Sequence, residues 1–83
     1  MKLTKAKRAV LSMMRDGAVI KEFDEVTPSW WLEGGSAVYP RTAKGLIRMK
    51  AIEYFAHEGG QPGILSYRIT EVGRQALREG ERG

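Results

Sequence analysis

The 83-residue chain contains no cysteine, and its only histidine is His57. The lack of cysteine excludes disulfides, thiolate metal sites and cysteine nucleophiles, and it fits a reducing compartment. A single histidine cannot form a cluster of imidazole ligands. The two glycine-rich segments, at residues 33–36 and 58–63, do not have the pattern of a nucleotide-binding loop. The acids between positions 16 and 33 lack the spacing of a calcium loop. We therefore expect a protein that is not an enzyme, with no catalytic residues, no metal and no cofactor.

Long apolar runs are also missing. The longest runs fall far short of the ~20 residues needed to cross a bilayer, and no basic segment leads into an apolar signal core. We therefore predict a cytoplasmic location without membrane contact. Hydrophobic residues make up 42% and charged residues 29% of the chain, which is typical of a folded globular protein. The length corresponds to a single domain over residues 1–83, with a frayed tail at residues 79–83.

Positive charge is distributed unevenly along the chain, although the net charge is only +4. Residues 1–15 carry five cations and no acid, and residues 34–52 carry four cations and no acid. Residues 16–33, between them, carry one lysine and five acids. Two basic segments separated by an acidic one predict a two-sided molecule whose positive face suits a polyanion such as nucleic acid. Ordinary surface charge is the alternative interpretation.

The second basic segment has the periodicity of an amphipathic helix over residues 39–52, YPRTAKGLIRMKAI. At 100° per residue, its first three cations share an arc of about 60°. These cations are Arg41, Lys44 and Arg48. The apolar residues on the opposite side are Ala43, Leu46 and Ile47. Gly45 lies on the exposed arc and costs the helix about 1 kcal/mol relative to alanine, either because another group packs against its backbone or because the cost is tolerated.

The segments before this helix predict one helix and several strands. Thr4 as N-cap, followed by apolar residues at helical spacing, predicts a first helix that stops at Asp16 and Gly17. Residues 18–23 are rich in valine, isoleucine and phenylalanine, which favours a strand.

Residues 27–39 have two interpretations. Thr27 as N-cap and Pro28 at the first helical position would begin a short helix over residues 27–32. The adjacent Trp30 and Trp31, followed by a glycine-containing turn, instead favour two short strands. We favour the hairpin, in which only one of the two tryptophans can point inward because side chains alternate along a strand.

Two strands and a last helix are predicted after position 51. A strand beginning at Ile52, a turn within residues 58–63 and a returning strand over residues 64–69 form a hairpin. Thr70 caps the last, short helix. Its apolar positions predict a buried stripe formed by Val72, Ala76 and Leu77.

Three segments carry a resemblance to a known family: residues 3–11 (LTKAKRAVL), residues 40–54 (PRTAKGLIRMKAIEY) and residues 67–77 (YRITEVGRQAL). The order of elements and these segments resemble the winged helix-turn-helix fold of small bacterial and phage DNA-binding proteins. The resemblance implies an α+β winged helix with three helices and a C-terminal β-hairpin wing, to which the strand propensities of residues 27–39 add an extra β-hairpin before the recognition helix.

The chain departs from the family pattern at two places. Lys50 and Ala51 stand where a glycine usually ends the recognition helix, so no glycine is available there for a left-handed turn. The helix that normally precedes the recognition helix is missing or abbreviated, which puts the family's docking geometry in doubt.

The resemblance and the basic helix together imply that double-stranded DNA is the partner of a small transcription regulator or DNA-processing accessory factor of phage or mobile-element type. The recognition helix would contribute Arg41, Thr42, Lys44, Gly45, Arg48 and Lys50. Thr42 could bind a phosphate or cap the helix, and we favour the cap. The expected backbone clamps of the first helix are Lys5, Lys7 and Arg8. The wing would contribute His57, Gln61 and Arg68.

A second class of function remains open at this point. A non-catalytic protein-interaction module would use the acidic segment together with Trp30 and Trp31, because an exposed tryptophan on a small domain suits a partner contact. A homodimer is compatible with either function, since two-fold pairing doubles the contacts of one small module.

Overall fold

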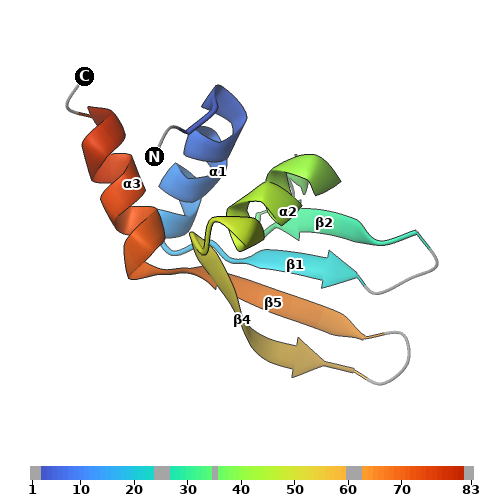
Figure 1. Ribbon diagram of the computed structural model, residues 1–83. Coiled ribbons are helices and arrows are strands. Elements are labelled where there is room, and N and C mark those ends of the chain that lie inside the picture. Colours follow the sequence, from blue (N-terminus) through green and yellow to red (C-terminus); the bar gives the residue numbers. More distant parts are fainter. Residues whose placement is uncertain (1–2, 24–26, 35, 60–62, 82–83) are drawn as a thin grey trace.

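The computed structural model describes residues 3–23, 27–34, 36–59 and 63–81, which form three helices and five strands (Figure 1). In chain order the elements are α1 (Lys5–Arg15), β1 (Ile20–Phe23), β2 (Ser29–Leu32), β3 (Ala37–Val38), α2 (Pro40–Arg48), β4 (Ile52–Glu58), β5 (Ile64–Ile69) and α3 (Glu71–Glu81). The content is therefore α+β, as the sequence predicts.

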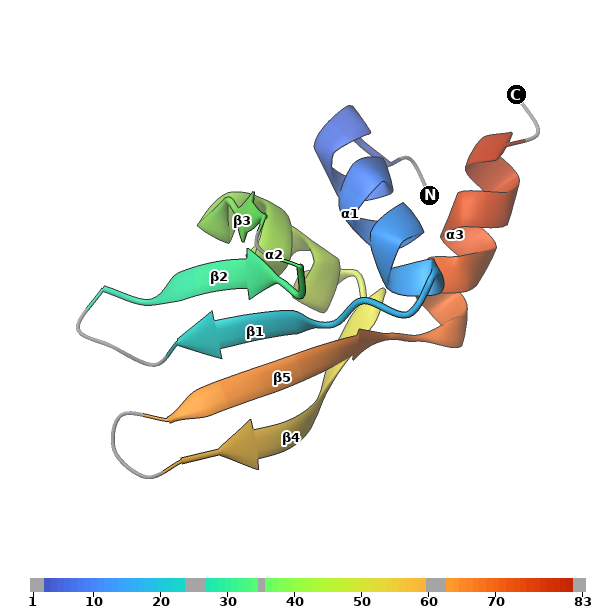
Figure 2. The ribbon, with the colours of Figure 1, turned by 180° about the vertical axis from the view of Figure 1, so that it is seen from behind.

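The strands form one antiparallel sheet with the order β3-β2-β1-β5-β4. Strand β1 lies at its centre, where Ile20 faces Leu32 of β2 on one side and Tyr67 of β5 on the other. The helices gather toward one end of the sheet, and α1 lies between α3 and α2 (Figures 1 and 2). Strands β1, β2, β4 and β5 extend away from α1 and α3 toward the other end of the sheet (Figure 2).

The prediction of a winged helix is wrong. In that fold a helix precedes the recognition helix and a hairpin projects as a wing, whereas here residues 29–32 form β2, and the sheet continues across both hairpins. The physical reason is the central strand β1, which pairs with β2 and with β5 and joins the two hairpins into one sheet. The predicted hairpin before α2 is confirmed, because β2 and β3 pair with Trp30 opposite Val38.

Helix α1 begins and ends as its sequence predicts. Thr4 is the N-cap, and its hydroxyl accepts a hydrogen bond from the Lys7 amide at 3.2 Å. After Arg15 the chain turns at Gly17, whose φ of 112° is readily adopted by glycine. The Gly17 amide donates to the Met14 carbonyl and the Ala18 amide to that of Met13, which satisfies these two carbonyls in the last turn of the helix.

Helix α2 ends at Arg48, four residues before the predicted end. The same turn motif closes it, since the Lys50 amide donates to the Ile47 carbonyl and the Ala51 amide to the Leu46 carbonyl. Lys50 takes the left-handed position with φ of 61°, although it carries a side chain that disfavours this conformation by about 1–2 kcal/mol. The chain can then enter β4 at Ile52 directly after the turn.

Thr70 caps α3 as predicted, accepting a hydrogen bond from the Gly73 amide at 3.2 Å. Its hydroxyl also donates to the Lys50 carbonyl at 2.6 Å, so the cap ties α3 to the end of α2. Ala76 and Leu77 are buried as predicted, but Val72 is 43% exposed. Buried Gly73 instead occupies the contact with the turn after α2, which has no room for a larger residue.

One hydrophobic core lies between the helices and the sheet. Its members from the helices include Leu11, Met14, Leu46 and Leu77. Its members from the sheet include Ile20, Trp30, Leu32, Ile52 and Ile69. The two tryptophans alternate as expected, with Trp30 at 4% and Trp31 at 41% exposure.

Candidate nucleic-acid interface

A groove of about 710 Å³ lies between the N-terminal half of α1 and the exposed side of α2. Its basic lining residues are Lys7, Arg41, Lys44 and Arg48. We call these four residues the basic face. The rest of the lining is small or uncharged: Thr4, Ala6, Pro40, Thr42 and Gly45.

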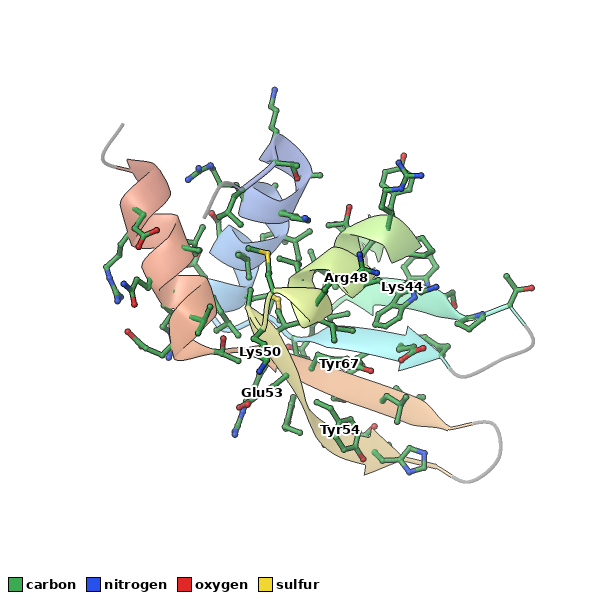
Figure 3. The ribbon with its side chains drawn as sticks, in the orientation of Figure 1. Lys44, Arg48, Lys50, Glu53, Tyr54 and Tyr67 are labelled. Carbon is green, nitrogen blue, oxygen red and sulfur yellow. The ribbon has the colours of Figure 1, made fainter. Side chains whose placement is uncertain are left out.

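The amphipathic pattern of α2 explains why its cations reach this groove. Ala43 and Leu46 are completely buried, so the opposite side of the helix must face solvent. Arg41, Lys44 and Arg48 are exposed there, as the sequence predicts. Figure 3 shows Lys44 and Arg48 on α2, with Tyr67 and Tyr54 on the sheet below them.

Lys7 is the cation that α1 adds to the basic face. Its side chain is half-buried and lies against Gly45, where a Cβ would come within 2.7 Å of the Lys7 Cε and 2.9 Å of its Nζ. This contact identifies the end of Lys7 as the group that packs against Gly45. The sequence indicates each residue separately but gives no signal that pairs them, because the contact depends on how α1 crosses α2.

The charge of the basic face is not balanced by ion pairs among the described residues. Within residues 3–23, 27–34, 36–59 and 63–81, no carboxylate forms an ion pair with Lys7, Arg41, Lys44 or Arg48. Each of these side chains therefore keeps its charge available to an external anion. Neighbouring positive charges repel, and an anion bound among them would remove that cost.

The other residues predicted to contact DNA from α1 and α2 lie in different environments. Lys5 and Arg8 do not line the groove, because they project from α1 at other angles than Lys7. Thr42 is nearly buried and does not cap α2, whose N-cap is Tyr39 without a side-chain hydrogen bond. The favoured capping role of Thr42 is therefore wrong. Lys50 is exposed, beyond the end of the groove.

The β4–β5 hairpin does not present its predicted residues together. Arg68 bonds to Glu53 at 3.0 Å and lies 5.5 Å from the ring centre of Phe55. It points to the opposite side of the sheet from its neighbour Tyr67, because adjacent strand residues alternate. His57 is exposed opposite Leu65, on the Tyr67 side. Gln61 lies outside the described residues.

Tyr54 and Tyr67 were not predicted as surface features beside the basic helix. Tyr54 is 54% exposed and packs edge-on against Tyr67, with 6.2 Å between ring centres. Burial, followed by a 3.0 Å hydrogen bond to Glu22, raises the pKa of Tyr67 to about 12. Tyr67 is therefore a neutral donor at physiological pH. The pairing of Tyr54 with Tyr67 requires the strand register, which the sequence alone does not give.

The residues predicted for a protein interface are divided by the fold. Trp30 is buried, and its Nε1 has no hydrogen-bond partner within the described residues. Trp31 is on the other side of the sheet, beside Phe23 and Lys21 at a hollow of about 280 Å³. The acidic segment is not one surface, since Glu22 bonds to Tyr67 while Asp16 and Glu33 are exposed elsewhere, and Asp24 and Glu25 lie outside the described residues.

The described part of the chain also bears on metal sites and membrane spans. It holds no group of three or more histidine or carboxylate side chains placed to bind a metal ion. None of its helices is long and apolar enough to cross a membrane. Comparison with protein-family models, curated proteins and solved structures gives no match for this chain.

Proposed function

We propose that this protein binds double-stranded DNA through the basic face and acts as a small transcription regulator or DNA-processing accessory factor. The observation that carries the proposal is the convergence of four cations from α1 and α2 on one groove, without a paired carboxylate in the described residues. Phosphate oxygens would supply the missing counter-charge. The proposal does not use winged-helix docking, because strands β2 and β3 precede α2 directly and belong to the same sheet as β4 and β5.

The chemistry of the basic face suits a phosphate backbone more than a single small anion. Arg41 and Arg48 are about two turns apart on α2, and Lys7 reaches the groove from another helix, so the charges are spread along the helix. Arginine can also bind guanine through two hydrogen bonds in the major groove. The same residues can therefore provide general affinity and a degree of base preference.

NMR maps the interface directly. We expect amide shifts along Lys7 and residues 41–48 when labelled protein is titrated with a short duplex of mixed sequence, and weaker shifts at higher salt. Amides on the exposed side of α3 serve as the internal control and should not move. Shifts confined to α3 or to the sheet around Trp31, or none at low salt, would refute the proposal.

A second candidate function has one specific observation in its favour. Trp31 is 41% exposed on the side of the sheet opposite the basic face, next to Phe23. Exposed aromatic residues are enriched in protein interfaces. A protein-interaction role would depend on Trp31, whereas buried Trp30 would contribute only to folding. Trp31→Ala should then abolish partner binding without affecting DNA binding, and Arg41→Gln with Arg48→Gln should leave partner binding intact.

A further inference from the structure

The contact between Lys7 and Gly45 places a positive charge at an unusual position. The end of the Lys7 side chain occupies the space where a residue other than glycine would have its Cβ. Lysine side chains normally extend into water to keep the ammonium hydrated. Here the side chain is half-buried and rests on the backbone of α2. The ammonium therefore lies in the groove, next to Gly45.

Two arginines flank this ammonium. Arg41 lies four residues before Gly45 and Arg48 three residues after it, so both are on the same side of α2 as Gly45. All three cations line the same groove, and no carboxylate of the described residues pairs with them. Like charges arranged along one groove favour a row of anions such as the phosphates of a nucleic-acid backbone.

We propose that Lys7, lying on Gly45, forms the seat of one phosphate group of the nucleic-acid backbone, and that Arg41 and Arg48, about one turn to either side, bind the phosphates next to it. This inference rests on the proposed function and adds a defined anchoring point to it. Lys7 and the arginines donate to the phosphate oxygens, and two arginine forks can each hold a pair of oxygens. Because position 45 has no side chain, the end of Lys7 can lie against the backbone of α2, and this leaves space in the groove for the phosphate.

Gly45→Ala tests the seat without changing any charge. The new methyl group must displace the end of Lys7, while alanine favours the helix. We expect the variant to remain folded and to bind every duplex sequence about tenfold more weakly, with the salt slope reduced by about 1. Lys7→Gln should have a similar effect, and combining the two should add little, because both remove the same contact.

The outcomes separate the seat from the proposed function. If Gly45→Ala binds DNA as tightly as the unchanged protein while Arg41→Gln with Arg48→Gln weakens binding, the seat is refuted and the proposed function stands. If the unchanged protein does not bind DNA, inorganic phosphate is the second probe. A phosphate-induced shift of the Gly45 amide that Lys7→Gln abolishes would support the seat with a free phosphate as its source, and no shift would overturn it.

Discussion

The cations of this protein fall into two environments. On β5 and α3, Arg68 pairs with Glu53 at 3.0 Å and Arg78 pairs with Glu71 at 2.8 Å. The basic face between α1 and α2 has no such pair within the described residues. Exposed ion pairs contribute at most about 1 kcal/mol to stability, so the difference concerns binding more than folding. Charge that the fold leaves unbalanced marks the surface available to an anionic partner.

The largest expected effect comes from comparing two helical glycines, buried Gly73 of α3 and half-buried Gly45 of α2. A Cβ at Gly73 would overlap the Ala51 carbonyl oxygen and approach Ile69, and backbone cannot move aside as a flexible side chain can. We expect Gly73→Ala to lower the free energy of unfolding by about 3 kcal/mol, or roughly 15 °C in Tm. Gly45→Ala, which meets only the end of Lys7, should leave Tm unchanged or higher. Thermal unfolding of both variants checks this, and equal destabilisation would contradict it.

Charge reversal at one residue of each region compares the two regions by their effect on DNA affinity. Arg48→Glu places a negative charge in the groove, and we expect it to weaken DNA binding about 100-fold, or about 2.7 kcal/mol. Arg78→Glu makes the same change of net charge on α3 and should cost less than about threefold. Fluorescence anisotropy with one labelled duplex measures both. Equal losses would show that only the net charge matters.

Replacement of Lys50 should affect stability more than binding. Its φ of 61° is strained for a residue with a Cβ, so Lys50→Gly should stabilise the protein by about 1 kcal/mol, or roughly 5 °C in Tm. Because Lys50 does not line the groove, DNA affinity should fall by less than about threefold. A larger fall than this would extend the basic face beyond its four residues.

The smallest expected effect concerns the ion pair between Arg78 and Glu71 on α3. The hydrogen bond and charge of Arg78 lower the pKa of the Glu71 carboxyl. Glu71 therefore contributes stability at neutral pH that is lost as the pH falls through its pKa in the folded protein. In Arg78→Gln we expect the pKa of Glu71 to rise toward its ordinary value, as followed by NMR of the side-chain carboxyl. Arg48→Gln should leave that titration unchanged, and a shift there would indicate that the two regions are coupled.

Local signals in the sequence predicted most of the elements. Thr4 and Thr70 cap their helices, and the adjacent tryptophans alternate along β2. The sheet order could not be predicted, because the pairing of β1 with both β2 and β5 joins segments far apart in the chain. The end of α2 was placed too late because Lys50 adopts a conformation usually left to glycine.

The candidate site could be predicted only where one helix defines it. The helical period brings Arg41, Lys44 and Arg48 to one side of α2, and the structure places all three along the groove. The contact of Lys7 with Gly45 depends on the crossing of two helices, and no local pattern encodes it. Arg68 was predicted to contact DNA, but it pairs with Glu53 on the neighbouring strand. That partner can be identified only when the strand register is known.

The most direct test measures how DNA affinity depends on salt concentration. Four phosphates neutralised by the basic face should give a slope of about −3.6 for log K against log salt. Arg41→Gln with Arg48→Gln should reduce it to about −1.8, while the matched pair Arg74→Gln with Arg78→Gln on α3 should leave it unchanged. A flat response of the unchanged protein, or the same loss of slope in both double variants, would contradict binding through the basic face.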